Sequence, residues 1–535
     1  MKLPRTVPFL RSLGLPRPQL QLQRQLRLLP LLPLLPLLPL LPLLPLTAAL
    51  NGCMNVGPNY SLPKDALVNA PLANAQIEGA DATLTSRGNV PAVWWKLYDD
   101  PVLNGLVDEA LQSNTDLRVA AANLARSREA LGVAQAQGGF SGKASAVIER
   151  AQESAEQYLL TEKLPVVNEG DIGISVAYEI DLFGKLRRGV EAAQADAEAV
   201  QAAADLARIT VVADVVRAYV EQCSAAEELK IAQQSLALQR QRVDVSRRLR
   251  DAGRGNQTEV TRGQTQVDTL FADIPRYTAR RKIAQYRLAA LLARAPSDLP
   301  LAVLACEKLP QISQPIPVGD GAALLKRRPD VREAERQLAA STARIGVATG
   351  ALYPTVSIGA SAGLTGVLED LGTSPTARWG FGPLISWTFP ANGARGRVRE
   401  AQASSQVALA RFDGVVLTAL RETETSLATY ASDYARADAL RAALKSATQS
   451  ADETHRLYRA GRESFISDLD ATRTLTSTKS QVAVAEGQVA IDQVNLFLAL
   501  GGGWEETPAA APHVPTSSGA TPVRSQQATP VTKAP

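Results

Sequence analysis

Histidine, methionine and cysteine are all scarce in this sequence of 535 residues. The two histidines are His455 and His513, and Met54 is the only methionine after the initiator. So few histidines leave zinc chemistry and a histidine-based catalytic triad with almost no residues to use. We therefore expect no catalytic, cofactor-binding or metal-ligating residues, and a lipid-anchored enzyme is disfavoured because no nucleophile and base can be paired.

The three cysteines have different contexts. Cys53 follows Leu50-Asn51-Gly52, an apolar run and a basic segment, which is the order of a bacterial lipoprotein signal. We expect residues 1–52 to be a signal peptide that is removed, leaving Cys53 with N-palmitoyl and S-diacylglycerol groups. The Leu-Leu-Pro repeats at 28–46 would make a poor transmembrane helix, because proline removes helical hydrogen bonds. A disulfide between Cys223 and Cys306 is left open by the sequence.

A strong excess of one charge is also missing. Removal of residues 1–52 takes away six basic residues and no acidic ones, so the formal charge changes from +4 to −2. A nearly neutral mature chain gives no support for a nucleic-acid partner.

The sequence contains an internal duplication. The segment NTDLRVAAANLARSREALGVA at 114–134 matches RPDVREAERQLAASTARIGVA at 328–348, so that Asp116 pairs with Asp330 at an offset of 214. Further on, Phe183 pairs with Phe389 at an offset of 206, and Gly253 pairs with Gly461 at an offset of 208. The decrease in the offset indicates a deletion in the second half, within residues 350–389. We expect each half to contain a helix, a strand pair, a very long helix, a tight turn and a second helix.

The long helices are predicted by the absence of helix breakers. No glycine or proline occurs between Gly189 and Gly253, and Gly414 is the only one from Arg397 to Ala460. The 67 residues from Lys185 to Asp251 would span about 100 Å as one helix. Helices of this length exceed those of ordinary globular domains and suit an extended helical assembly.

The predicted strands alternate between apolar and small or polar residues, which is typical of membrane β-strands. The alternation covers DIGISVAYEIDLF, TVSIGASAGL and WGFGPLISWTF, and a fourth, weaker strand is expected near 143–152. A half-buried soluble sheet is the alternative interpretation. Four strands are too few for a membrane barrel, and an open edge in lipid would leave backbone groups unpaired. Several copies would then have to close one barrel.

The chain resembles the outer membrane efflux family of TolC-like channels, and most closely its NodT/OprM-like lipoprotein branch. The matching motifs are CMNVGPNYSLP (53–63), WWKLYDDPVLNGLVDEAL (94–111), YEIDLFGKLRRGVEAAQA (178–195), LLKRRPDVREAERQLAASTARIGVATGALYPTVSIGAS (324–361), LYRAGRESFISDLDATRTL (457–475) and LALGGGW (498–504). The resemblance implies a mainly α-helical protein with a membrane β-barrel, in which each chain gives four β-strands and very long helices. It also implies a homotrimer with a 12-stranded β-barrel and a periplasmic α-barrel.

Six segments follow from these patterns and the resemblance. We expect a signal peptide at 1–52, a lipid-anchored extended segment at 53–93, a first repeat at 94–300, an inter-repeat linker at 301–320, a second repeat at 321–504 and a disordered tail at 505–535. Trp94 and Trp95 are expected to pack the extended segment onto the helices, with ligand stacking as a remote alternative.

The resemblance also implies a periplasmic gate at the hairpin ends. It places a locking tyrosine at Tyr458, its acidic partner at Glu259, with Thr258 beside it, and a ring carboxylate at Asp470. Ser467 occupies the other ring position, where an aspartate is usual, and Glu463 replaces a linking arginine. Asp468, one residue away, is a candidate substitute for the missing carboxylate. The residues expected at the tip turns, where an adaptor would dock, are Gly253, Arg254, Gly461 and Arg462.

The function implied is an exit duct in the outer membrane that passively conducts small toxic compounds or drugs. The partners implied are a periplasmic adaptor (membrane fusion) protein and an inner-membrane RND pump. Two alternatives within the class are a duct for type I protein secretion and one for metal-ion efflux. A structural coiled-coil lipoprotein without a pore is a further alternative, which conductance measurements would separate from a channel.

Overall fold

The computed structural model describes residues 55–502 apart from 76, 78, 80, 82, 307 and 389. The predicted signal peptide, the lipidated Cys53 and the predicted tail at 505–535 lie outside the described residues.

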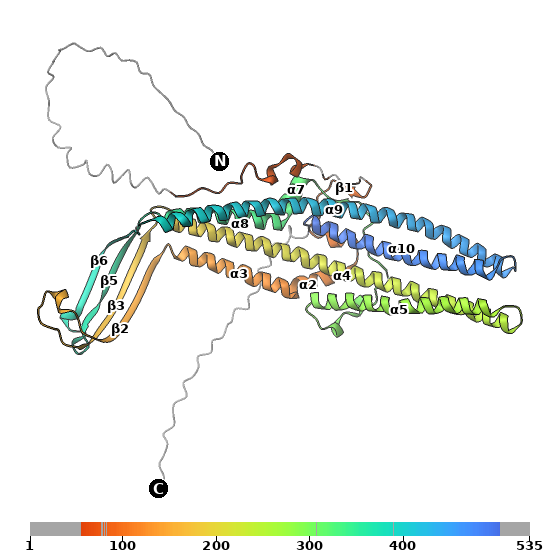
Figure 1. The fold of residues 1–535 in the computed structure, drawn as a ribbon, viewed down its shortest axis with the longest axis horizontal. Coiled ribbons are helices and arrows are strands. Elements are labelled where there is room, and N and C mark those ends of the chain that lie inside the picture. Colours follow the sequence, from red (N-terminus) through yellow and green to blue (C-terminus); the bar gives the residue numbers. More distant parts are fainter. Residues whose placement is uncertain are drawn as a thin grey trace, which may run out of the picture. The chain divides into compact units, whose positions relative to one another are not determined.

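The described chain is built from two similar repeats, which run through the same order of elements (Figure 1). The first repeat consists of α3 (Thr115–Ala136), β2 (Phe140–Ala151), β3 (Val167–Ile180), α4 (Lys185–Asp251) and α5 (Gln257–Leu291). The second consists of α8 (Pro329–Gly350), β5 (Thr355–Val367), β6 (Ala377–Ser386), α9 (Asn392–Arg459) and α10 (Phe465–Ala499). The matched helices have 22 and 22, 67 and 68, and 35 and 35 residues.

The long helices confirm the prediction from the missing helix breakers, since α4 begins at Lys185 and ends at Asp251. Their buried positions are mostly small or β-branched, which lets α8 and α10 pack closely on α4. None of the helices in the described part of the chain combines the length and the hydropathy needed to cross a membrane.

The four long strands form one antiparallel sheet in the order β2-β3-β5-β6. The register aligns the apolar sets, because Ile174 faces Ala362 and Ala362 faces Trp379 across neighbouring strands. The opposite face carries small and polar residues, such as the row Lys143, Ser175 and Ser361. In the described chain, the outer edges of β2 and β6 have no strand partner. The apolar side chains are exposed, with Trp379 at 84% and Phe381 at 76%.

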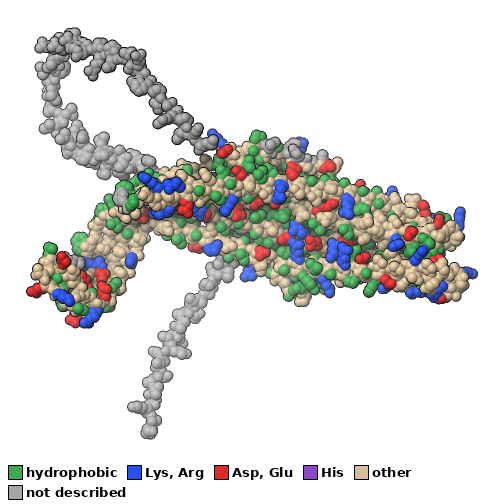
Figure 2. All heavy atoms as spheres, in the orientation of Figure 1, with side chains coloured by type: hydrophobic (Ala, Val, Ile, Leu, Met, Phe, Trp, Pro, Cys, Tyr) green, Lys and Arg blue, Asp and Glu red, His purple; other side chains and the backbone are tan. Residues whose placement is uncertain are grey.

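The distribution of charge agrees with this two-faced sheet. Figure 2 shows charged side chains spread over the helices, whereas on the sheet they gather at the end that carries the strand connections. The connection between β5 and β6 (368–376) is shorter than the one between β2 and β3 (152–166). This difference accounts for most of the deletion inferred from the change in repeat offset.

Shorter elements occur around the middle of the helices and in the connections between the strands. They are η2 (Leu67–Asn69), η3 (Pro71–Asn74), β1 (Thr85–Ser86), η4 (Trp94–Tyr98), α2 (Pro101–Ser113), η5 (Ala155–Tyr158), η6 (Pro296–Asp298), α6 (Leu301–Leu304), β4 (Ile316–Pro317), α7 (Gly321–Arg327), η7 (Leu368–Asp370) and η8 (Ser374–Thr376). The two-residue strands β1 and β4 pair in parallel and join the N-terminal segment to the linker between the repeats.

The tryptophan pair belongs to the core. Trp94 is fully buried and stacks on Phe497 of α10, with ring centroids 4.7 Å apart, and Trp95 is 3% exposed. The expected packing role is therefore correct for both residues, and neither ring is open to a ligand.

The inter-repeat linker is attached to helices of both hairpins. Cys306 forms a disulfide with Cys223 of α4, which answers the question that the sequence left open. Further along, the side chain of Gln493 in α10 pairs with the backbone of Ile312, donating to its carbonyl at 2.9 Å and accepting from its N–H at 3.3 Å. The linker thus connects the first hairpin to the second.

Candidate functional site at the hairpin ends

The two helical hairpins end in the same backbone turn. At the end of α4, the Gly253 N–H binds the Arg250 carbonyl at 2.9 Å and the Arg254 N–H binds the Leu249 carbonyl at 2.8 Å. At the end of α9, Gly461 and Arg462 make the equivalent bonds to Tyr458 and Leu457, both at 2.9 Å. These pairs of bonds define Schellman motifs, which need a residue in the left-handed conformation.

Glycine supplies that conformation in both turns. The φ angles of Gly253 and Gly461 are +70° and +69°, and a Cβ atom at either residue would meet nothing within 4 Å. Backbone conformation, and not crowding, therefore explains glycine at these positions. In each turn a helix cap lies three residues later, where the side chains of Asn256 and Ser464 accept from the backbone of α5 and α10.

Tyr458 and Glu259, predicted to form a lock, lie on different hairpins but close enough to interact electrostatically. Burial raises the pKa of Tyr458, and the nearby carboxylates of Glu259 and Asp468 raise that pKa further. Glu259 belongs to the first turn of α5, where its carboxylate accepts from the Asn256 side chain at 3.2 Å and its N–H donates to the Asn256 oxygen at 2.9 Å. Thr258 is exposed on the same turn.

Asp470 and Ser467 lie on the first turns of α10. Asp470 is exposed and lines a groove of about 360 Å³ between α5 and α10, whose walls carry Arg262, Thr265, Gln266, Thr269, Ile466, Leu469, Asp470 and Arg473. Ser467 is half-buried, and its N–H donates to the Ser464 hydroxyl at 3.1 Å. The hydroxyl of Ser467 lies 3.0 Å from the same Ser464 oxygen, so the side chain also supports the helix cap within its own hairpin.

Asp468 cannot replace the missing ring carboxylate in this structure, so that expectation is wrong. Its side chain is buried, with 3% of the residue exposed. The carboxylate pairs with His455 of α9 at 3.1 Å and with Arg242 of α4 at 3.5 Å. A side chain that is buried between three helices of one chain does not face a pore. The sequence offered no signal for this cluster, because its members are brought together only by the packing of the two hairpins.

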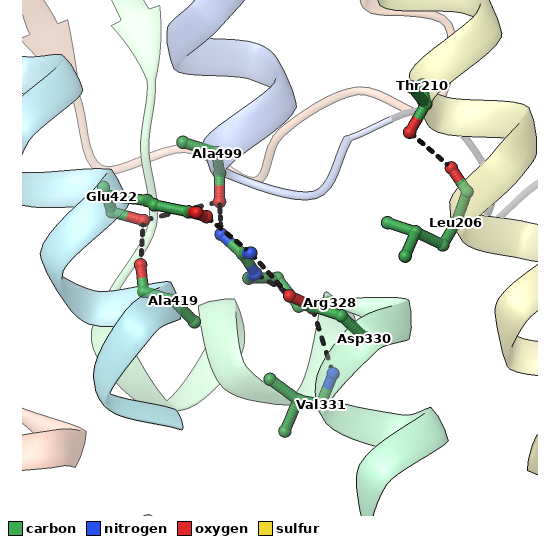
Figure 3. Close-up of polar contacts among 9 residues, drawn as sticks. Leu206, Thr210, Arg328, Asp330, Val331, Ala419, Glu422 and Ala499 are labelled. Carbon is green, nitrogen blue, oxygen red and sulfur yellow. Dashed lines mark hydrogen bonds and ion pairs between the residues drawn. The ribbon is translucent and has the colours of Figure 1, made fainter. Parts of the chain in front are cut away.

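A second polar cluster surrounds Arg328 at the start of α8 (Figure 3). Its guanidinium donates to Asp330 at 3.0 and 2.6 Å, to Glu422 at 2.8 Å and to the Ala499 carbonyl at 2.9 Å. Burial lowers the pKa of Arg328, but the two carboxylates more than offset this effect, so that the pKa is raised overall. The cluster joins α8, α9 and the end of α10.

The Arg328 cluster borders a cavity of about 380 Å³, lined by Leu206, Ile209, Thr210, Arg328, Pro329, Asp330, Glu422, Ser426, Asn495, Leu498, Ala499 and Gly501. Each guanidinium nitrogen of Arg328 already has an acceptor in the protein. The arginine therefore stabilises the helix junction and is not held ready for an anion. Within the described ranges, no group of three or more histidine, cysteine, aspartate or glutamate side chains is arranged to hold a metal ion.

The architecture defines a class of protein. Two repeated helical hairpins joined to a sheet with one apolar and one polar face are the architecture of channel-forming proteins of the bacterial outer membrane. The chain belongs to the outer membrane efflux protein family, which matches residues 106–294 and again residues 322–502. The double match agrees with the duplication found in the sequence and in the structure.

Related proteins agree with this assignment. The chain is 28% identical to nodulation protein T of Rhizobium leguminosarum bv. trifolii, over 85% of this chain and 95% of that protein. It is also 28% identical to the toluene efflux pump outer membrane protein TtgF of Pseudomonas putida, over 86% of this chain and 96% of the relative. The solved outer-membrane channel OprN is 34% identical, with a TM-score of 0.77 over 84% of this chain and 99% of that channel.

These findings identify the location and the general function. The protein resides in the outer membrane and serves as the exit duct of an efflux system. Its mainly helical fold with a four-stranded sheet is that of the TolC-like channels.

Proposed function

We propose that three copies of the chain assemble into a trimer, whose sheets close one 12-stranded β-barrel in the outer membrane above a periplasmic α-barrel. The observation that carries this proposal is the sheet with two unpaired edges, β2 and β6, and one exposed apolar face. Lipid offers no hydrogen bonds to an open strand edge, so the edges of neighbouring copies must pair. The polar face would then line a water-filled lumen.

Lipidation of Cys53 would add a second attachment to the membrane. Asn55, the first described residue, is only two positions away and packs against Gly184, where β3 passes into α4. The described chain therefore begins beside the junction of the sheet and the helices. We propose that acyl chains on Cys53 insert into the same membrane that holds the barrel.

The gate would be formed at the hairpin ends by Thr258, Glu259, Tyr458, Ser467 and Asp470. Tyr458 and Glu259 would hold the two hairpins together through polar contact. Asp470 is exposed, and its copies would meet near the axis of a trimer, where like charges repel and cations are favoured over anions. With serine at position 467, the chain would carry one carboxylate ring at this level.

The two tip turns would receive the partner proteins. Gly253 with Arg254, and Gly461 with Arg462, present the same exposed backbone turn on both hairpins. A trimer would thus offer six nearly equivalent docking turns to a periplasmic adaptor protein. The adaptor would connect the duct to an inner-membrane RND pump, which would select the small toxic compounds that are exported.

The gate is tested by the double variant Glu259→Ala with Tyr458→Phe. If these residues hold the tip closed, the variant will admit large antibiotics through the outer membrane of a strain without the pump. The matched control is Tyr286→Phe, an exposed tyrosine of α5 away from the hairpin end. Unchanged antibiotic uptake in the double variant, at equal amounts of protein in the membrane, would contradict the placement of the gate.

A further inference from the structure

A charged network crosses the polar face of the sheet, at the opposite end of the chain's fold from the hairpin ends. Arg378 of β6 binds Asp171 of β3, donating from Nη2 to both carboxylate oxygens at 2.8 Å and from Nε to one of them at 3.1 Å. The same Nε donates to the Thr365 hydroxyl of β5 at 2.7 Å, and that hydroxyl donates to the Asp171 carboxylate at 2.5 Å. The guanidinium thus connects three neighbouring strands.

Two glycines leave the space that the arginine side chain occupies. Gly363 of β5 is the direct partner of Arg378 in the sheet, and Gly173 of β3 is the partner of Gly363. A Cβ atom at Gly173 would lie 2.8 Å from Arg378 Nη2, and one at Gly363 would lie 3.3 Å from Arg378 Cζ. Beside larger residues the arginine would have to extend away from the sheet. Here its guanidinium lies against the backbone of β3 and β5.

The network is open to water on the polar face. The side chains of Arg378 and Asp171 are 42% and 35% exposed, and an ion pair with this exposure adds little to stability. Its main effect is therefore on where the arginine lies and on the net charge of the face.

The charges around the network are mostly acidic. Asp171 and Arg378 lie near the ends of β3 and β6 that carry the strand connections. The same face carries Glu149 of β2 and Glu169 of β3, which are direct partners in the register. Three of these four charged side chains are acidic. Because Asp171 neutralises Arg378, the pair adds no net charge beside the two glutamates.

We propose that Arg378 is a specificity-determining residue of the duct and that Asp171, Gly173 and Gly363 position it. Held flat and neutralised, Arg378 leaves the lumen open near its outer mouth, where cationic solutes pass in preference to anionic ones. Because this role exists only if the polar face lines a lumen, it rests on the proposed trimer. A released guanidinium would extend toward the axis, and three copies would form a ring of positive charge that rejects cations.

The experiment measures the electrostatic potential at a reporter cysteine, Ser361→Cys, on the polar face of β5. Ser361 lies two residues from Gly363 along the strand, a distance of about 7 Å. Isolated outer membranes that contain the full-length protein are treated with a cationic and with an anionic methanethiosulfonate reagent. The ratio of the cationic to the anionic reaction rate reports which charge is favoured at this level. Cys223 and Cys306 are joined to each other, and the chain without the reporter gives the background.

The charge of the pair is tested by removing one partner at a time. Asp171→Asn should lower the rate ratio at least about threefold, because an uncompensated arginine repels the cationic reagent and attracts the anionic one. Arg378→Gln should raise the ratio by a similar factor. The double variant should return to within about twofold of the reporter protein, because it again carries no net charge at the pair. Unchanged ratios in both single variants would overturn the role of Arg378.

The position of the guanidinium is tested without a change of charge. Gly173→Val places side-chain atoms where Arg378 Nη2 lies, so the arginine must leave β3. The rate ratio should then fall at least about twofold, since the positive charge moves into the lumen and Asp171 stays at the wall. The matched control is Gly382→Val on the same face of β6, where a Cβ atom would meet nothing within 4 Å. Equal ratios in the two variants would overturn the positioning role of Gly173.

A second cysteine distinguishes failure of this proposal from failure of the proposed barrel. Ala362→Cys lies on the apolar face and should not react, whereas Ser361→Cys should react. Absent reaction at Ser361→Cys, or equal reaction at both positions, would contradict the water-filled lumen and the role of Arg378 with it. Reaction at Ser361→Cys alone, with ratios that none of the variants changes, would overturn the role of Arg378 and leave the barrel intact. Detergent-resistant assembly, compared on gels, confirms that each variant is folded.

Discussion

Arg188 donates a hydrogen bond from Nη2 to the side-chain oxygen of Asn59, 2.6 Å away, and thereby fixes the N-terminal segment to the start of α4. The same guanidinium donates to the backbone carbonyls of Val56 and Gly57 at 3.2 and 3.3 Å, and pairs with Glu191 at 2.6 Å. Arg188 is only 2% exposed. One buried arginine thus organises the segment that follows the proposed lipid anchor.

Arg188→Ala should release this segment. The variant leaves the buried Val56 carbonyl and the Gly57 carbonyl without these donors and removes a buried charge, a loss on the order of 2–4 kcal/mol. Limited proteolysis followed by N-terminal sequencing should show rapid cleavage within residues 55–70. Arg187→Ala is the control, because Arg187 is 46% exposed and its contact with Asp181 is 3.4 Å long. Equal protection of both variants would show that Arg188 does not hold the segment.

Alanine at the tip glycines should destabilise both turns. Gly253→Ala and Gly461→Ala place a Cβ atom on a residue with φ near +70°, at a cost of about 1 kcal/mol each. Gly414→Ala is a matched control, because its Cβ atom would also meet nothing within 4 Å but it lies inside α9. That control should be neutral or stabilising, by up to about 1 kcal/mol. Hydrogen exchange of the tip amides measures the effect, and equal exchange in all three variants would contradict the backbone argument.

The disulfide between Cys223 and Cys306 should be present in protein taken from cells. It closes a loop with a sequence separation of 83 residues. The chain-entropy estimate for such a loop is about 4–5 kcal/mol. Cys223→Ser with Cys306→Ser should therefore lower the thermal denaturation temperature and loosen the linker. Two thiols that react with maleimide in the denatured, unreduced protein would show that the bond does not form.

Asp492 should make the stability of the protein depend on pH. Burial raises the pKa of Asp492 to about 6, a 2.9 Å hydrogen bond from Gln488 opposes the increase, and the carboxylate of Asp433 adds to it. An unfolded aspartate has a pKa of about 3.9, so the folded state holds an extra proton between these values. Stability is therefore lost as the pH rises through the range of about 4 to 6.

Asp492→Asn should accordingly stabilise the protein at pH 7.5, and its advantage should shrink towards pH 4.5. Thermal denaturation in detergent at both pH values measures this difference. The control is Asp438→Asn, an exposed aspartate of the same hairpin. A variant less stable than the wild type at pH 7.5 would contradict the raised pKa.

Much of the fold could be predicted because its signals are local. The missing glycines and prolines predicted the long helix α4, and the alternating pattern identified strands whose apolar side chains share one face. The recurring Ala-Gly-Arg predicted both tip turns. The sequence match between the two repeats did not predict their packing contacts. Gly132 and Gly346 are equivalent in sequence, but only at Gly346 would a Cβ atom collide with Arg188.

The parts that could not be predicted depend on packing between distant segments. Nothing in the spacing of Arg242, His455 and Asp468 indicates that they meet, because they lie on three helices of two hairpins. The disulfide between Cys223 and Cys306 likewise depends on the path of the linker. The gate residues were assigned by resemblance, and their roles between subunits remain predictions because they concern contacts with other copies.

The most direct test of the account is whether the edge strands of neighbouring copies pair. Gly382→Cys on the polar face of β6 is combined in turn with Ser141→Cys, Lys143→Cys and Ser145→Cys on β2, and intact outer membranes are treated with a short bismaleimide. We predict that at least one combination gives linked species of two and three copies and none larger. Only single chains in all three combinations, or a ladder that continues beyond three, would contradict a closed barrel of three subunits.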